Sequence, residues 1–235
     1  MRPQNQPPSD GEAAGHGARY VAIITDGNGR WAQARGLPVI EGHDAGADVV
    51  KARLRDAADL GIRELTVYSF STENWSRPIE EVAALMAMFS RRIREETPEL
   101  RDEGVRMRFI GRRDRVSREL ASQMEWAEAE TAGGARITLF VAFDYGGRNE
   151  ILDAAEHYSG GGEEAFRALL YAPEMHDPDL IIRTSGEQRM SNYLLWQSAY
   201  SELVFAPELW PDFDRAAFER ALAEYGRRGR RFGGR

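Results

Sequence analysis

Residues 20–30, with the sequence YVAIITDGNGR, contain an apolar run that breaks abruptly into a polar, glycine-bearing loop. The run has no polar alternation, which is typical of a strand covered on both faces, as in a parallel sheet. Ligands of such sheets bind beyond the carboxyl ends of the strands, where Asp26, Gly27, Asn28, Gly29 and Arg30 fall. Two interpretations remain open. Asp26 or Asn28 caps the following helix, or the loop cradles an anion while Asp26 holds a divalent cation.

The rest of the chain alternates between short apolar runs and segments of helical character. Further strands are predicted at 65–70, 105–110, 137–142, 180–182 and 203–205. Helices are expected between them, including 45–60, 78–103, a charged helix reaching about 131, 163–170 and 214–225. This order predicts an α/β fold in a single domain, with a mainly parallel central sheet of about six strands flanked by helices.

Composition narrows the class of protein. The chain has 235 residues, 42% of them hydrophobic, which is enough for one substantial core. A formal net charge of −7 argues against a general nucleic-acid binder. The absence of cysteine excludes disulfides, thiolate metal sites and a cysteine nucleophile.

The amino-terminal segment differs in composition from the rest. Residues 1–18 are rich in proline, glycine and polar residues and are expected to be a disordered tail, followed by one domain at 19–235. No run approaches the roughly 18 apolar residues needed to span a bilayer, and the tail lacks the apolar core of a signal peptide. We therefore expect a cytoplasmic protein that touches membranes only peripherally.

Cationic and polar side chains gather in the loops that follow the predicted strands. Because the carboxyl ends of parallel strands share one rim, these loops should bring together Arg30, Arg77, Arg148, Arg183, Arg189, His43, Asn28, Asn74 and Ser191. Arginines beside glycines and hydroxyls suit phosphate or diphosphate. Few carboxylates accompany them, and one or two carboxylates plus substrate phosphates is the usual way of holding Mg²⁺.

Common nucleotide-binding and hydrolase signatures are missing. The chain has no Walker GK[ST] sequence, and Gly27-x-Gly29 lacks the third glycine of a dinucleotide fingerprint. No Ser-His-Asp set follows from spacing. The residues alone therefore indicate a Mg²⁺-assisted enzyme acting on phosphorylated, non-nucleotide substrates.

Several long motifs resemble the cis-prenyltransferases, and in particular the bacterial undecaprenyl diphosphate synthase family. They are DGNGRWA, GHDAG, LTVYSFSTENWSRP, YGGR, RTSGEQRMSN and LLWQSAYSELVF with LWPDF, and the likeness runs from about Tyr20 to Gly234. The resemblance implies a transferase that condenses isopentenyl diphosphate onto an allylic diphosphate such as farnesyl diphosphate, with Mg²⁺ as cofactor. It also implies a homodimer and an apolar tunnel for the product.

The resemblance also assigns roles to residues. It implies catalytic roles for Asp26, which positions Mg²⁺, and Asn74, which is implicated in proton removal, with Glu202 as the second metal ligand. It implies that substrate is bound by Gly27, Asn28, Gly29, Arg30, Trp31, His43, Ser71, Glu73, Trp75, Arg77, Arg183, Arg189, Ser191, Arg231 and Gly233. Of these, Arg231 and Gly233 form a carboxy-terminal element that in the family reaches towards the partner subunit.

Some positions depart from the family pattern. Val39 replaces an arginine, Thr25 a methionine and Asp144 an asparagine, while Phe140 and Phe143 are bulkier than is usual. These changes bear on substrate preference and product length. The small Ser69 favours a medium product of about C50–C55 by resemblance, whereas either phenylalanine would shorten it if it faced the tunnel.

Three other functions are alternatives to this one. The first is a shorter-chain cis-prenyl diphosphate synthase. The second is a non-catalytic partner subunit of a heteromeric prenyltransferase, although such subunits usually lose the Asp-Gly-Asn loop that is intact here. The third is an α/β enzyme acting on sugar phosphates, which an assay with isopentenyl diphosphate would separate from the others.

Overall fold

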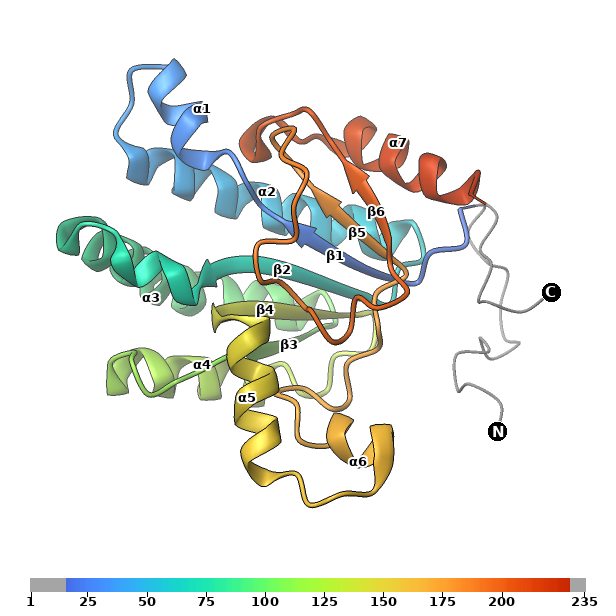
Figure 1. The fold of residues 1–235 in the computed structure, drawn as a ribbon. Coiled ribbons are helices and arrows are strands. Elements are labelled where there is room, and N and C mark those ends of the chain that lie inside the picture. The colour runs from blue at the N-terminus through green and yellow to red at the C-terminus, as the bar shows by residue number, and fades with distance from the viewer. Residues whose placement is uncertain (1–15, 229–235) are drawn as a thin grey trace.

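The computed structural model describes residues 16–228, which fold around a six-stranded sheet (Figure 1). The strands are β1 (Tyr20–Ile24), β2 (Glu64–Ser71), β3 (Val105–Ile110), β4 (Ile137–Tyr145), β5 (Leu180–Arg183) and β6 (Glu202–Phe205). Their order across the sheet is β3-β4-β2-β1-β5-β6, and every neighbouring pair is parallel. The predicted α/β fold with a parallel sheet is confirmed.

Helices cover both faces of this sheet (Figure 1). They are α1 (Asn28–Ala34), α2 (Val39–Asp59), α3 (Ile79–Asp102), α4 (Arg118–Glu130), α5 (Gly147–His157), α6 (Gly162–Arg167) and α7 (Arg215–Gly226), with short 3-10 turns η1 (Thr72–Ser76) and η2 (Trp210–Asp212). Local sequence explains several starts. Ser117 caps α4 by accepting from the Leu120 amide, and Asp214 caps α7 by accepting from the Ala217 amide.

Both faces of strand β1 pack against apolar residues, which explains its apolar sequence without polar alternation. Val21 and Ile23 face a cluster built with α2, α3, α4 and α7. Ala22 and Ile24 face a second cluster, on the opposite side, formed with residues 171–194. Both faces of the strand are therefore buried, as a central strand of a parallel sheet requires.

The structure shifts several predicted boundaries. Helix α2 begins at Val39, six residues before the predicted start, so His43 is a helical residue. Strand β4 continues to Tyr145, three residues beyond the predicted end, so Phe143 and Asp144 belong to the strand. Sequence reasoning ended this strand too early because Asp144 is polar, yet its side chain is fully buried.

The ends of the described region bear on the predicted tail and on membranes. Residues 1–15 of that tail lie outside the described residues, whereas Ala18 is buried and His16 Nε2 donates to the carbonyl of Leu60. Between residues 16 and 228, none of the helices has both the length and the apolar character needed to cross a bilayer.

Candidate active site

The loops that follow β1, β2, β4 and β5 meet at the carboxyl edge of the sheet. The register places Ile24 beside Arg183, so the end of β1 adjoins the end of β5. Thr184 Oγ1 donates to the Asp26 carbonyl over 2.7 Å and accepts from the Asp26 amide over 2.9 Å. The two loops are thereby joined at the backbone of Asp26.

Glycine shapes the loop after β1. Gly27 is the N-cap of α1 and has a φ of 113°, a conformation that favours glycine, and no side chain caps the helix. The interpretation of Asp26 or Asn28 as a helix cap is therefore wrong. In α2, a Cβ at Gly42 would lie 2.2 Å from the Asn28 carbonyl oxygen, so glycine is needed for the close approach of this loop to α2.

The Asp26 carboxylate is held between two arginines. Arg183 Nη2 lies 2.8 Å from its Oδ2, and Arg30 Nη2 lies 3.3 Å from its Oδ1. Partial burial would raise the pKa of Asp26, but hydrogen bonding and charge from Arg183, with the charge of Arg30, lower it overall. Asp26 is therefore ionised at neutral pH.

Arg183 is the buried cation of the site. Its Nη1 donates to Ser191 Oγ over 2.7 Å and to the Arg189 carbonyl over 2.5 Å. Its buried Nε has no hydrogen-bond partner among the described residues. Arg183 thus fixes the loop that carries Ser191 and keeps one donor unused.

Two further cations of the rim are exposed. Arg30 donates to Ser185 Oγ over 2.6 Å and lies 3.7 Å from Glu187, while Arg189 forms an ion pair with Glu187. Exposed ion pairs of this kind contribute little to stability. Both guanidinium groups can therefore exchange these partners for an anionic ligand at small cost.

His43 projects from α2 between two polar groups. Its Nδ1 lies 3.5 Å from Asn28 Nδ2, and its Nε2 lies 3.4 Å from Arg77 Nη1. Burial, followed by the charge of Arg77, lowers the pKa of His43 to about 4. His43 is therefore neutral at physiological pH and accepts a hydrogen bond at one ring nitrogen.

The loop after β2 is organised by its own side chains. Asn74 Oδ1 accepts from the Ser71 amide over 2.9 Å in a capping box at the start of η1. Trp75 Nε1 donates to Asp144 Oδ1 over 2.8 Å, and Glu73 Oε1 accepts from Asn192 Nδ2 over 2.9 Å. Asn74 and Glu73 are thereby held at the same rim as Ser191.

Trp31 of α1 is held by contacts with Asp212 and Arg35. Its Nε1 donates to Asp212 Oδ1 over 2.7 Å, and the Arg35 guanidinium lies 4.2 Å from the centroid of its ring. A Cβ at Gly29 would be in van der Waals contact with Val39 Cγ1 at 3.8 Å. Arg231 and Gly233 lie outside the described residues.

Glu202 does not join this rim. It is the first residue of β6 and pairs in register with Leu180, the first residue of β5. It therefore lies at the amino edge of the sheet, on the order of 10 Å along the strand direction from the rim. There its carboxylate pairs with Arg228 Nη1 at 2.8 Å. Among residues 16–228, no three His, Asp or Glu side chains converge as a metal site.

Asn192 is a rim residue that sequence reasoning missed. Besides contacting Glu73, its Oδ1 accepts from the Arg148 amide over 2.8 Å, and its carbonyl accepts from the Gly147 amide over 2.7 Å. It therefore ties together the loops that follow β2, β4 and β5. The signal was an asparagine directly after Ser191, a residue type that tolerates the positive φ of 63° found here.

A cavity of about 110 Å³ opens beside the rim between α2, α3 and the sheet. Its walls include Ser69 and Phe89, together with Thr25, Asn28 and His43 of the rim. Phe140 faces the other side of the sheet, whereas Phe143 packs against Phe89 with ring centroids 4.6 Å apart. Only the second of these two phenylalanines therefore supports the cavity wall.

Comparisons with known proteins agree with this arrangement. The sequence profile of the family described as "Putative undecaprenyl diphosphate synthase" matches residues 24–233. Isoprenyl transferase 2 of Bradyrhizobium diazoefficiens is 49% identical over 97% of this chain and 95% of its own length. Isoprenyl transferase of Thermotoga maritima is 52% identical over 92% of this chain and 97% of its own length.

Solved structures extend the likeness to three dimensions. Lavandulyl diphosphate synthase from Lavandula x intermedia, in complex with dimethylallyl diphosphate, has a TM-score of 0.87 at 35% identity and covers 92% of this chain and 98% of its own. A probable undecaprenyl diphosphate synthase from Campylobacter jejuni has a TM-score of 0.79 at 28% identity, covering 92% and 99%.

The fold and the site define a transferase built on a parallel α/β sheet. The chain belongs to the undecaprenyl diphosphate synthase family of isoprenyl transferases.

Proposed function

We propose that this enzyme condenses isopentenyl diphosphate onto an allylic diphosphate, farnesyl diphosphate in the first instance. The product is a cis-polyprenyl diphosphate of medium length, about C50–C55, of the kind that serves as a lipid carrier in cell-wall synthesis. The observation that carries the proposal is the ionised Asp26 carboxylate set between Arg183 and Arg30. It provides an anionic metal ligand directly beside cations that suit diphosphate.

The arginines supply charge neutralisation. Breaking the bond between the allylic carbon and its diphosphate oxygen places negative charge on the leaving group, and preorganised donors stabilise that charge. Arg30 and the backbone amides of Gly27 to Gly29 bind the allylic diphosphate, with Arg77 and neutral His43 beside it. Arg183, Arg189 and Ser191 bind the isopentenyl diphosphate.

Magnesium fits the residues that are present. Mg²⁺ is usually held by one or two carboxylates together with substrate phosphates, and the partly exposed, ionised Asp26 offers one such carboxylate. When bound, the ion would neutralise charge on the diphosphates. Asp26 thus presents the metal ligand. Asn74 is the residue proposed to take part in removing the proton that is lost as the new carbon–carbon bond forms.

A homodimer is part of the proposal. Strand β6 forms one edge of the sheet, and such edges are favoured places for another chain to pack. Glu202 lies at the amino edge of the sheet, so it could complete the metal site at Asp26 only from a second subunit. Light scattering coupled to size-exclusion chromatography tests for the dimer. If the active enzyme is a monomer, Glu202 does not contribute to the metal site.

The cellular setting follows from the product. We propose that the enzyme works in the cytoplasm and contacts membranes peripherally, because a long polyprenyl chain is insoluble in water. Co-sedimentation with vesicles of neutral and anionic lipid, with and without product, tests this contact.

A product assay decides the main proposal. Purified enzyme with farnesyl diphosphate, labelled isopentenyl diphosphate and Mg²⁺ should form polyprenyl diphosphates of about C50–C55 by mass spectrometry. Products of C20 or less would favour the shorter-chain synthase, which the packing of Phe143 on Phe89 supports. If no allylic primer is extended at any Mg²⁺ concentration, the catalytic proposal fails and the partner-subunit alternative gains.

A further inference from the structure

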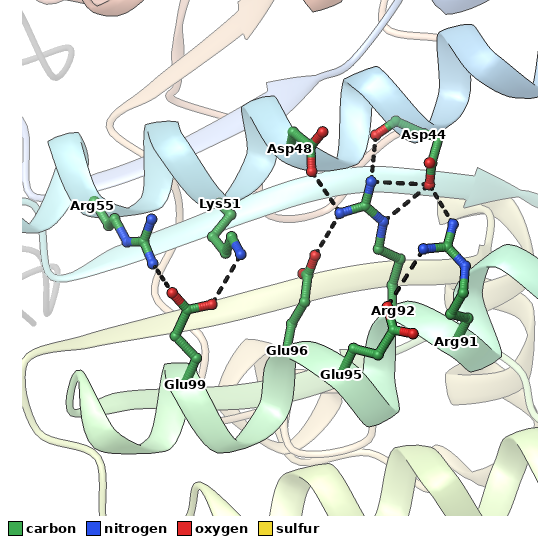
Figure 2. A network of polar contacts seen from close by, with 9 residues as sticks. All are labelled: Asp44, Asp48, Lys51, Arg55, Arg91, Arg92, Glu95, Glu96 and Glu99. Carbon is green, nitrogen blue, oxygen red and sulfur yellow. Dashed lines mark hydrogen bonds and ion pairs between the residues drawn. The ribbon is translucent and has the colours of Figure 1, made fainter.

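Helices α2 and α3 face each other with charged residues along one wall of the cavity (Figure 2). We call this set the α2–α3 charge zipper. On α2 it comprises Asp44, Asp48, Lys51 and Arg55, and on α3 and its C-cap it comprises Arg92, Glu96, Glu99 and Glu103. The spacing is four, three and four residues in both helices, which keeps each set on one helix face.

Charge is complementary at the Asp44–Arg92, Lys51–Glu99 and Arg55–Glu103 contacts, whereas Asp48 and Glu96 are both acidic and share Arg92. Acidic residues precede basic ones on α2, and basic precede acidic on α3, so the two helices match when they run parallel. Asp44 Oδ1 lies 2.9 Å from Arg92 Nη2, and Lys51 Nζ lies 2.9 Å from Glu99 Oε2. A large slip of one helix along the other would place like charges opposite each other. The pattern therefore fixes one register.

Individual residues of the zipper serve more than one partner. Arg92 Nη1 lies 2.6 Å from Asp48 Oδ1 and 2.7 Å from Glu96 Oε1. Glu99 joins Lys51 to Arg55 Nη2, which lies 2.6 Å from its Oε1. Removing the Glu99 charge would thus take away the Glu99 partner of Lys51 and leave Arg55 paired with Glu103.

Three members of the zipper also face the cavity. Lys51, Arg92 and Glu96 line it beside apolar side chains such as Met88 and Leu54. Their side chains are only 15–23% exposed. An apolar product tail that reached this wall would have to displace ion pairs, and hydrocarbon offers charged groups no compensating partner.

The cavity as it stands is small for a growing isoprenoid. An apolar cavity of about 150 Å³ holds a molecule the size of benzene, whereas this cavity has a volume of about 110 Å³. A longer chain fits only if part of the cavity wall moves outward. The floor consists of strands joined by backbone hydrogen bonds. The zipper consists of partly exposed side-chain pairs, which are individually weak and screened by salt.

We propose that the α2–α3 charge zipper sets the length at which the product stops growing. A closed zipper confines the apolar tail and presents charge to its end, whereas a weakened zipper lets α2 and α3 separate and admits further isoprene units. This inference rests on the proposed chain elongation. It adds a specificity determinant distant from Asp26 and from the diphosphate sites.

The central test compares products of the wild-type enzyme and Glu99→Gln, which removes the negative charge from both ion pairs of Glu99 with α2 while keeping the shape of the side chain. With farnesyl and isopentenyl diphosphates and Mg²⁺, the variant should make products longer by at least one five-carbon unit at equal turnover. The double swap Lys51→Glu with Glu99→Lys restores an ion pair between these two positions but sets a cation beside Arg55, so it should return the product length only part of the way to that of the wild-type enzyme.

Glu130→Gln is the matched control. Glu130 pairs with Arg101 of α3 at 3.0 Å but belongs to α4, away from the zipper. Its loss should leave product length unchanged. A longer product from this control as well would mean that any loosening of α3 suffices, and would overturn the assignment to the zipper.

Salt provides a second measurement that needs no variant. Raising NaCl should lengthen the wild-type product, compared at equal turnover, and should have a smaller effect on Glu99→Gln, which has already lost two of the ion pairs of the zipper. Wild-type lengths independent of NaCl, or a Glu99→Gln variant that melts normally and makes wild-type lengths, would overturn the proposal. These outcomes differ from failure of the proposed function, in which the wild-type enzyme extends no primer.

Discussion

Arg183 Nη2 lies 2.8 Å from Asp26 Oδ2, so the last residue of β5 holds the carboxylate that follows β1. The guanidinium is almost fully buried, with 5% of its side chain exposed, whereas 28% of the Asp26 side chain is accessible. The buried partner thus fixes the accessible one, and an ionised carboxylate faces the rim.

Replacing Asp26 by Ala or Asn should abolish turnover, because the only carboxylate that follows β1 in this loop would be lost. A decrease of at least about 100-fold is expected from the loss of a group that stabilises transition-state charge. Product formation from labelled isopentenyl diphosphate measures it.

The same variants should melt a few degrees lower, since Arg183 loses one of its partners but keeps Ser191. Glu208→Gln, which removes only a surface pair with Arg220, serves as control and should be neutral in both assays. Turnover retained in Asp26→Ala would refute its role.

His43 should make the enzyme less stable as the pH falls from about 6.5 to 4. The unfolded histidine binds a proton near pH 6.5, whereas the folded side chain resists protonation down to about pH 4 because it is buried beside Arg77. The unfolded state therefore binds more protons in this window, and acid favours unfolding by about 3 kcal/mol for this group. Urea denaturation at several pH values measures it, and His43→Gln should flatten the curve.

His176 supplies the opposite sign as a control. A hydrogen bond from His176 Nδ1 to the Glu64 carboxylate, opposed by burial, raises the pKa of His176, so its contribution is present below its unfolded pKa and is lost as the pH rises through the folded value. His176→Gln should therefore remove stability at low pH rather than at neutral pH. Parallel pH curves for the two variants would contradict both assignments.

Asp144 should anchor the loop that carries Asn74. Its fully buried carboxylate accepts from Trp75 Nε1 over 2.8 Å and from Arg115 Nε over 3.0 Å. Asp144→Ala should lower the unfolding free energy by about 1–3 kcal/mol, because it leaves the Trp75 donor without an acceptor, whereas Arg115, with 37% of its side chain exposed, can turn to solvent. It should also change the fluorescence of Trp75.

Asp144→Asn keeps an acceptor for Trp75 but removes the charge that pairs with Arg115. It should therefore cost stability while retaining most of the activity, whereas Trp75→Phe loses only the indole donor. Equal activities in Asp144→Ala and the wild-type enzyme would show that the loop needs no such anchor.

The sequence predicted the elements better than it predicted their partners. The run at 20–24 lies where the apolar pattern placed it, because a central parallel strand leaves a strong local signal. The loop predicted to reach Arg30 ends at Gly27, since α1 begins at Asn28. The buried state of Asp144 had no local signal, since it depends on Arg115 and Trp75 arriving from other elements. The separation of Glu202 from Asp26 follows from strand register, which residue spacing does not encode.

The α2–α3 charge zipper likewise could not be predicted from the spacing of its residues in the sequence. The spacings of Asp44 to Arg55 and of Arg92 to Glu103 are visible in the sequence, but each could equally belong to a solvated helix face. Only the parallel packing of α2 against α3 pairs them and places Lys51 and Arg92 at the cavity. Sequence periodicity thus predicted the helices, whereas the pairing of their charged residues depends on how the two helices pack.

Ser69 gives the sharpest test of the cavity as the product site. It lies in β2 and lines the cavity opposite Phe89 and Met88 of α3. Ser69→Leu adds bulk to a wall formed by a strand, which cannot move aside as a side-chain pair can. The variant should therefore make shorter products than the wild-type enzyme, with initial condensation rates nearly unchanged because Asp26 and Arg183 are not touched. Thr66→Val, in the same strand but buried against Met175 on the other side, should leave product length unchanged. Mass spectrometry of the products measures both, and full-length products from a folded Ser69→Leu enzyme would place the growing chain elsewhere.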